Sequence, residues 1–527
     1  MIKGTTVELS ALSHVRKAGL NSRKACLEGT RQQTLNGLIE WISDPRAPAV
    51  CFLLGGAGTG KSSIAHSIGD YFRPLRRLGF FCFDRSFQQD RHPEVVFSTI
   101  AHDLANRNAD FRRALAEILR EQPELKESTD ITAQWDSLIL EPLRKFPPAG
   151  PILVVIDAFD ECSSDDRRSR YLLLKLITQS SDSFPPNFRI LITSRPDRDV
   201  LDALELSSNN HWRVNSMNLD DKRDEAISDI ERYVRHELAP RRRASEGELD
   251  DEDYKLLALK AEGLFQWAAT ACRAILDRPT GLTLKERFNS RLGVILRGGP
   301  SSLDDLYREI LRHLVTSDDP VVMARFRSVM GQVLSSSAPL SMKSLHDIRR
   351  HVTRSETDEI TLILLDMGPL LSGVSSPTTP VLPLHTSFRD FLVDKTRSQE
   401  WFIDVASGHS TMALGCFRVM NYGLSFNICR LGTSYVSNCD IPDLEASCVQ
   451  YIPESLSYAS CNWKDHLVDP ALRLDLQKEL REFMQQKLLF WFELLSLLKS
   501  VNRAAPSLEA ALMYFDVSLL ARIRILT

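Results

Sequence analysis

Eight residues near the start of the chain have the types and the spacing of a phosphate-binding loop. Residues 55–62 match G-x-x-x-x-G-K-[ST], and they stand between the apolar run Cys51–Leu54 and a helical pattern at Ile64–Ile68. Glycines let backbone N–H groups close around phosphate oxygens, and the helix start adds its positive dipole end. We therefore predict a nucleoside triphosphate site. Its binding residues are Gly55, Gly56, Ala57, Gly58, Thr59, Gly60, Lys61, Ser62 and Ser63.

Within this loop two side chains would do most of the chemistry. Lys61 would reach the β- and γ-phosphates and so take part in catalysis, and the Ser62 hydroxyl would hold one position of a Mg²⁺ ion. A second apolar run, Ile152–Ile156, ends in Asp157, with Asp160 and Glu161 close behind. A strand that ends there would present Asp157 to the same Mg²⁺, because open α/β sheets bind ligands at the carboxyl ends of their strands.

The acidic residues after Asp157 are candidates for activating water. Glu161 is the predicted general base, and Asp160 is the predicted assistant, since both leave the strand where an attacking water would lie. A third apolar run, Phe188–Thr193, is followed by Ser194 and Arg195. A guanidinium pairs well with phosphate oxygens, so Arg195 is a candidate sensor of the γ-phosphate. The alternative is an arginine that pairs with a surface acid.

These runs belong to a region in which strand-like and helix-like patterns alternate, which is typical of an α/β fold. Short apolar runs at 50–54, 79–83, 152–156 and 188–193 are separated by helical patterns, as in a parallel sheet covered on both faces. An amphipathic helix precedes them at 35–42. Beyond Leu219 helical patterns dominate, with one stripe at 227–234, another at 256–268, and further helices at 303–315 and 321–335. The breaker cluster at 298–302 separates the last two from what precedes.

Composition narrows the class of protein. The chain has 527 residues, a formal net charge of -4 and 25% charged residues, which argues against a dedicated nucleic-acid binder. The ten cysteines show neither C-x-x-C pairs nor zinc-ligand spacing. Cysteines scattered singly in this way fit a protein of a reducing compartment. The most apolar stretch, Leu488–Leu498, is too short to span a membrane. We therefore expect a cytoplasmic protein without a membrane span or a nucleic-acid partner.

Taken together, the three motifs resemble the NACHT family of signal-transduction NTPases. The acidic motif reads Asp-Ala-Phe-Asp-Glu-Cys, the third reads Thr-Ser-Arg-Pro, and the likeness is to the fungal branch, whose N-terminal part is nephrocystin-3-like. Cys26–Arg31 is similar to the segment that precedes the NTPase core there, which implies that Thr30 and Arg31 lie near the adenine. A plain helix N-cap at Thr30 is the alternative.

The resemblance also implies the order of the domains. It gives an N-terminal helical segment, a P-loop NTPase core, a helical domain, a winged-helix-like domain and a C-terminal helical domain, at 1–45, 46–215, 216–300, 301–400 and 401–527. Leu384–Leu392 resembles the winged-helix segment whose histidine contacts the ADP β-phosphate, so His385 is a further nucleotide-binding candidate. A histidine that caps or packs at a helix start is the alternative.

By this resemblance the chain is a slow ATPase and a molecular switch, closed with ADP and open with ATP. ATP or ADP with Mg²⁺ would be its cofactors, and a preference for GTP is left open. The resemblance implies a homo-oligomer in the ATP form, unknown protein partners, and a role in innate-immunity or cell-death-like signalling. Two alternatives remain, a scaffold that binds nucleotide with little hydrolysis and a P-loop kinase or motor. No ankyrin or WD-repeat period is present to serve as a sensor.

Overall fold

The chain folds into two compact units, residues 1–306 and 307–527. The computed structural model describes residues 12–514 except 16, 89, 146–149, 163–166, 180–183, 210–213, 240–248, 278–280, 298–301, 354–357, 434 and 469–473. Most of the predicted breaker cluster at 298–302 lies outside these described residues. The division into five domains stays a prediction.

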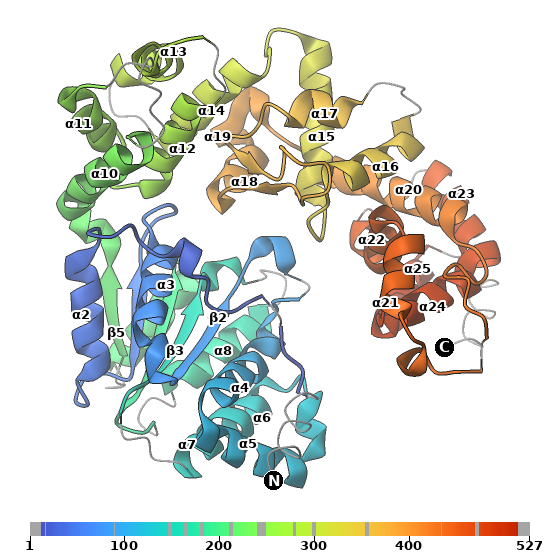
Figure 1. Ribbon diagram of the computed structural model, residues 1–527, viewed down its shortest axis with the longest axis horizontal. Helices are drawn as coiled ribbons and strands as arrows, with labels where there is room; N and C mark the ends of the chain where they lie inside the picture. The colour runs from blue at the N-terminus through green and yellow to red at the C-terminus, as the bar shows by residue number, and fades with distance from the viewer. Residues whose placement is uncertain are drawn as a thin grey trace. The chain divides into compact units, whose positions relative to one another are not determined.

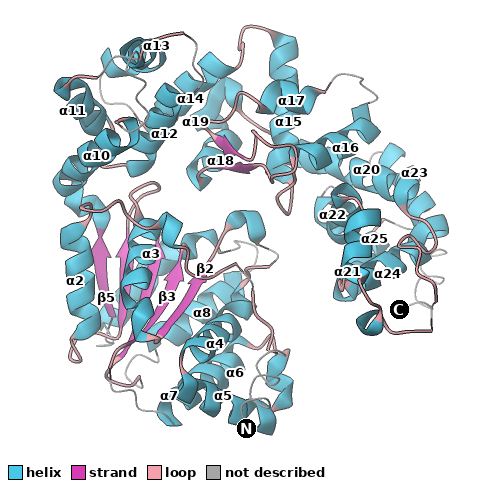
Figure 2. Cartoon of the chain, viewed as in Figure 1, coloured by secondary structure: helices cyan, strands magenta, loops and turns pink. Residues whose placement is uncertain are grey.

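Unit 1 is built on a parallel sheet of five strands (Figure 2). The strands are β1 (Val50–Leu54), β2 (Leu78–Cys82), β3 (Ile152–Asp157), β4 (Phe188–Ser194) and β5 (Val214–Asn218). Their order across the sheet is β2-β3-β4-β1-β5. Strand β4 therefore lies between the strand that leads to the predicted loop and the strand that ends in Asp157, and the carboxyl ends of all three share one edge.

Helices cover both faces of this sheet, which confirms the predicted α/β class (Figure 1). Alternate strand residues face opposite ways, so Phe52 and Val154 enter one core while Leu53 and Val155 enter the other. The second core contains residues of α2 and α3, and the first contains residues of α4, α5 and α8. The helices are α2 (Gln32–Ser43), α3 (Lys61–Phe72), α4 (Val96–Arg107), α5 (Ala109–Glu121), α6 (Ile131–Ala133), α7 (Glu141–Lys145), α8 (Arg167–Gln179) and α9 (Arg198–Asn209).

Further helices complete unit 1. They are α10 (Arg223–Leu238), α11 (Asp251–Lys260), α12 (Phe265–Leu276) and α13 (Leu284–Arg297). The stripe predicted as a single helix over 256–268 is wrong, because the chain turns between α11 and α12. Glu262 and Gly263 there have φ angles of 50° and 85°, and such left-handed residues interrupt a right-handed helix. The turn places the first residues of α12 beside the predicted phosphate loop.

Unit 2 is mainly helical and contains one short antiparallel pair of strands, β6 (Leu371–Ser372) and β7 (Leu382–Pro383). Its helices are α14 (Leu303–Leu314, which begins before the boundary), α15 (Pro320–Ser335), α16 (Met342–Thr353), α17 (Glu359–Leu364), α18 (Thr386–Val393), α19 (Lys395–Ser398), α20 (Val405–Gly423), α21 (Leu444–Tyr451), α22 (Glu454–Asn462), α23 (Leu474–Glu482), α24 (Leu488–Leu497) and α25 (Ala504–Leu512). The winged-helix interpretation of 301–400 stays a prediction. In the described part of the chain, none of the helices is both long enough and apolar enough to cross a membrane.

Candidate functional site

The predicted phosphate loop joins the end of β1 to the start of α3. Gly58 and Gly60 have φ angles of 85° and 92°, which side-chain-bearing residues adopt at a cost. A Cβ on Gly58 would lie 2.6 Å from the Cβ of Gln266, so glycine is required there by the close approach of α12 as well. The sequence thus builds a tight loop whose backbone can close around phosphate oxygens.

Lys61, the first residue of α3, points back into this loop. Its Nζ donates hydrogen bonds to the carbonyl oxygens of Gly55 and Gly56 at 2.7 and 2.8 Å. Burial lowers the pKa of its ammonium group, while the carboxylate of Asp160 opposes that shift. The lysine is therefore held at the loop by weak acceptors, which phosphate oxygens can replace because they form stronger, charge-assisted bonds.

Three other parts of unit 1 contact the outside of the loop. The backbone N–H of Gln266, in the first turn of α12, donates to the Gly58 carbonyl at 3.1 Å. The Asp220 carboxylate, just after β5, accepts from the N–H of Gly56 at 3.1 Å. Arg31 donates from Nη2 to the Thr59 carbonyl at 2.8 Å. The loop is thereby tied to the segment before α2, to the residues after β5 and to α12.

Arg31 is more deeply engaged than the sequence indicated. Its side chain is 2% exposed, and its guanidinium lies 5.0 Å from the centroid of the Phe265 ring. Its Nε and Nη1 have no hydrogen-bond partner among the described residues. The N-cap of α2 is Arg31 itself, with φ 55°, whereas the Thr30 hydroxyl donates to the Leu27 carbonyl at 2.7 Å. The alternative of an N-cap at Thr30 is therefore wrong, and the place of both residues near the adenine stays a prediction.

At the end of β3 the Asp157 carboxylate is fully buried among donors. Its Oδ1 accepts from the Thr193 hydroxyl at 2.6 Å. Its Oδ2 lies 3.3 Å from the Cys82 sulfur and 3.9 Å from His66 Nε2. These three side chains come from β4, β2 and α3, so the packing of the sheet itself positions the predicted metal ligand.

Asp160 and Arg195, both predicted to act in catalysis, form an ion pair. The distance from Arg195 Nε to Asp160 Oδ2 is 2.9 Å, and the backbone N–H of Arg195 donates to Asp160 Oδ1 at 3.3 Å. The structure thus shows the alternative interpretation of Arg195, an arginine paired with an acid, although this acid is buried. A role of Arg195 at the γ-phosphate stays a prediction.

Glu161 lies just after the end of β3, at the same edge of the sheet. Its Oε2 accepts from the N–H of Arg85 at 3.2 Å. Burial, and then the charges of Asp84 and Asp160, raise the pKa of Glu161 to about 7. A carboxylate with this pKa is half protonated at neutral pH, which suits a group that takes up a proton.

The oxygen-bearing side chains near the loop suit a magnesium nucleotide. The Ser62 hydroxyl and the Asp157 carboxylate would provide oxygen ligands, which Mg²⁺ prefers together with water. Ser194, paired with Leu54 in the sheet register, has a buried hydroxyl without a hydrogen-bond partner in the described part of unit 1. A bound water or nucleotide oxygen would satisfy such a group.

His385, the remaining candidate, lies in unit 2 at the start of α18. It is the N-cap of that helix, and its Nδ1 accepts from the backbone N–H of Ser387 at 3.1 Å. The capping alternative therefore describes its contact in this structure, while a contact with ADP stays a prediction. Behind it Phe388 and Phe391 are buried against Tyr307, which anchors the helix.

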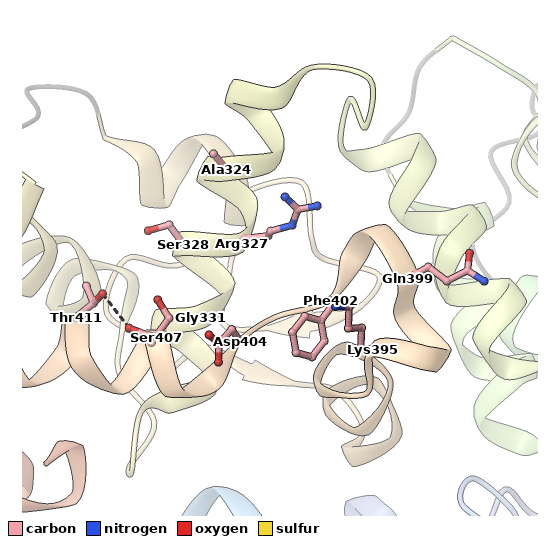
Figure 3. Close-up of a pocket in the computed structure, with 11 residues that line it drawn as sticks. Ala324, Arg327, Ser328, Gly331, Lys395, Gln399, Phe402, Asp404, Ser407 and Thr411 are labelled. Atoms are coloured by element: carbon pink, nitrogen blue, oxygen red, sulfur yellow. Dashed lines mark hydrogen bonds between the residues drawn. The ribbon is translucent and has the colours of Figure 1, made fainter. Parts of the chain in front are cut away.

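A separate groove of about 480 Å³ lies in unit 2 between α15 and α20 (Figure 3). Its floor is formed where Gly331 and Gly408 let the two helices approach closely, because a Cβ on Gly408 would lie 2.6 Å from the Gly331 carbonyl oxygen. At its rim Arg327 donates to the Glu400 carbonyl at 2.7 Å. The groove contains none of the residues predicted for nucleotide binding.

Four residues of the site were missed at the level of sequence: His66, Cys82, Asp220 and Gln266. His66 and Cys82 stand inside apolar patterns that indicate only packing. Asp220 follows a strand too polar to be recognised, and Gln266 lies in the first turn of α12, which the prediction had merged with α11. For Cys82 a usable indication did exist, since it lies near the end of an apolar run in an α/β region, where ligand-facing residues gather.

Comparison with known families supports the resemblance over one segment. Residues 29–195 match the family model described as Nephrocystin 3, N-terminal, which confirms that resemblance for a segment that contains the first two motifs and the third as far as Arg195. No curated protein matches the chain.

Several solved structures align with the chain at low identity. A signal transduction ATPase with numerous domains and a tetratricopeptide repeat sensor, from Pyrococcus horikoshii, aligns at 15% identity and a TM-score of 0.38, over 93% of this chain and 64% of that one. A Walker-type ATPase of Pyrococcus abyssi aligns at 14% and 0.32, over 67% and 93%. Drosophila ORC bound to DNA aligns at 10% and 0.28, over 63% and 79%. The chain spans less than two thirds of the first of these proteins, and at these scores no residue role is transferred.

Proposed function

Starting from the nephrocystin 3 N-terminal match of residues 29–195, we propose that this chain binds ATP or ADP with Mg²⁺ and hydrolyses ATP slowly as a molecular switch. The observation that carries the proposal is the shared edge of the sheet. There the glycine loop with its buried Lys61 follows β1, and the carboxylates of Asp157 and Glu161 stand at and just after the end of β3, with β4 between these two strands. A phosphate-binding loop, a metal ligand and a base at one edge of the sheet are the parts that triphosphate hydrolysis requires.

Each part has a distinct role in this proposal. Lys61 exchanges the Gly55 and Gly56 carbonyls for β- and γ-phosphate oxygens. Ser62 and Asp157 hold Mg²⁺, which when bound neutralises charge on the phosphates. Glu161 accepts the proton of the attacking water and becomes a neutral acid, a change that its surroundings of low polarity and negative charge favour.

The switch follows from the contacts on the outer side of the loop. Gln266 of α12 is bonded to Gly58, and Arg31 joins Thr59 to Asp229 of α10, whose carboxylate accepts from the Arg31 N–H at 2.8 Å. A change in the loop on nucleotide exchange therefore acts directly on the helices after the sheet. In the full proposal ADP favours a closed form through His385, and ATP favours an open form that self-associates in innate-immunity or cell-death-like signalling.

The alternative is a scaffold that binds nucleotide and hardly hydrolyses it. One observation favours it: Glu161 Oε2 already accepts from the Arg85 N–H, so the base is partly engaged before any water arrives. Nucleotide extracted from the purified protein, combined with phosphate release by the parent and by Glu161→Gln, separates the two. Bound ADP with turnover abolished by Glu161→Gln supports the switch. Tight nucleotide with equal, near-zero release in both proteins supports the scaffold, and no nucleotide binding at all rejects both.

A further inference from the structure

His66 is the one described histidine that faces the predicted metal ligand. It lies on α3, is 1% exposed, and stacks on the Phe80 ring at 4.7 Å between centroids. Its Nε2 is 3.9 Å from Asp157 Oδ2 and has no hydrogen-bond partner in the described part of the chain. An unpartnered polar atom at this depth is costly, so its orientation calls for a reason.

The other ring nitrogen decides where the proton is. The backbone N–H of Asn21 donates to His66 Nδ1 at 3.2 Å, and a nitrogen that accepts cannot carry a hydrogen. The neutral ring with an unprotonated Nδ1 has its hydrogen on Nε2. Asp157 Oδ2 lies 3.9 Å from this Nε2.

We propose that His66 is a positioning residue for the magnesium nucleotide, whose Nε2–H joins the Cys82 thiol in holding Asp157 Oδ2 while Thr193 holds Oδ1. This inference rests on the proposed function of Asp157 as a Mg²⁺ ligand. A shift of about 1 Å brings Nε2 within hydrogen-bond distance of Oδ2. With both oxygens held from inside the domain, the carboxylate cannot rotate about its Cβ–Cγ bond. A neutral donor suits this role, because a cationic partner would cancel the charge that attracts the metal.

A soft metal at this cluster is the competing interpretation. Among the described residues His66, Cys82 and Asp157 form a group whose ligand atoms all lie within 4.8 Å of one another. A tetrahedral Zn²⁺ with bonds of about 2.0–2.3 Å would fit such spacings. However, a zinc-bound histidine donates from its second nitrogen, and here that nitrogen accepts from Asn21. The hydrogen on Nε2 therefore occupies the lone pair that zinc would need.

Two substitutions separate the contacts of His66. In His66→Asn the amide oxygen replaces Nδ1 and keeps the Asn21 N–H satisfied, but the side chain at position 66 no longer offers an N–H to Asp157 Oδ2. In His66→Gln the longer amide places an N–H near the former Nε2, while the Nδ1 acceptor is lost. Mn²⁺ binding to the full chain, measured by electron paramagnetic resonance with a non-hydrolysable ATP analogue, should weaken about tenfold or more in the Asn variant. The Gln variant should stay within about threefold of the parent.

A purely structural role reverses this order, since the Asn variant then resembles the parent and the Gln variant is the poorer one. That reversal, or equal Mn²⁺ affinity in all three proteins, overturns the inference. Binding of the analogue in EDTA should be the same throughout, and a parent that binds neither analogue nor Mn²⁺ refutes the proposed function instead. Stoichiometric Zn²⁺ that is lost in Cys82→Ala establishes the metal interpretation. The tautomer can be tested without relying on any variant's activity, from the ¹⁵N shifts of the His66 ring in the parent. These shifts are assigned by their absence from the Asn variant. A proton on Nδ1 refutes the inference.

Discussion

The pH dependence of turnover is the sharpest test of Glu161 as the base. Its pKa of about 7 means that about a tenth of the side chain is ionised at pH 6 and about nine tenths at pH 8. Only the ionised form can accept the proton of water, so turnover should rise roughly tenfold between these pH values. A carboxyl group with the ordinary pKa of 4.5 would give a flat profile over the same range.

Phosphate release at saturating ATP, measured from pH 5.5 to 8.5 with ATP affinity followed in parallel, gives this profile. Asp84→Asn is the matched control, because the Asp84 charge raises the pKa of Glu161. Asparagine can still accept from the Ser86 N–H that Asp84 caps at 2.9 Å. The midpoint should therefore move to lower pH in this variant while the local turn is kept.

Removal of the base should abolish the pH dependence and most of the rate. Glu161→Gln should bind ATP normally and lose about 10²-fold or more in turnover. It should also stabilise the fold at high pH, since a carboxyl whose pKa is raised by folding stabilises below pH 4.5 and loses that contribution as pH rises through 7. At pH 8 the gain is on the order of 2–3 kcal/mol, and at pH 4.5 it vanishes. Parental turnover in this variant, or a flat profile in the parent, would refute the assignment and leave Asp160 as the candidate.

Three further outcomes are expected. Lys61→Ala should weaken ATP binding roughly tenfold or more, at least ~1.4 kcal/mol, by calorimetry, and unchanged affinity in a folded variant would exclude the loop as the site. Gly58→Ala should lower the free energy of unfolding without nucleotide by roughly 1–3 kcal/mol, and more than Gly60→Ala, because only the former meets a Cβ at 2.6 Å; equal losses would show that strain of the left-handed backbone alone acts. His385→Leu should speed ADP release by roughly ten- to a hundredfold and increase the mass of assemblies with ATP, whereas unchanged release and mass would leave His385 as a helix cap.

The sequence predicted the loop and the acidic strand because their chemistry needs few residue types at fixed spacing. Four strands were found within a residue at each end, since strands buried on both faces are apolar throughout. Strand β5 was not recognised as one, because it reads Val-Asn-Ser-Met-Asn and is only half buried at the sheet edge. Its pairing with β1 comes from the tertiary fold, and no local pattern in those five residues indicates it.

Side-chain partnerships were the harder part of the site to predict. Nothing in the spacing of Asp160 and Arg195 shows that they pair, because 35 residues of chain separate them and only the sheet brings them together. His66 reads as one polar residue in a helix that begins with Lys61, and its neighbour Asp157 is 91 positions away. Contacts of this kind depend on strand order, which periodicity does not encode.

The polar edge strand has a consequence for how copies of this chain could meet. An exposed edge of a sheet offers free N–H and C=O groups to any other strand, and apolar edges aggregate through them. Strand β5 is five residues long, and its Asn215 and Ser216 are exposed, so it offers little apolar surface to a strand laid beside it. Pairing of two sheets edge to edge through β5 is thereby discouraged. Self-association driven by nucleotide would then be a reversible docking of folded surfaces. It would leave the five-stranded sheet of unit 1 intact through every cycle.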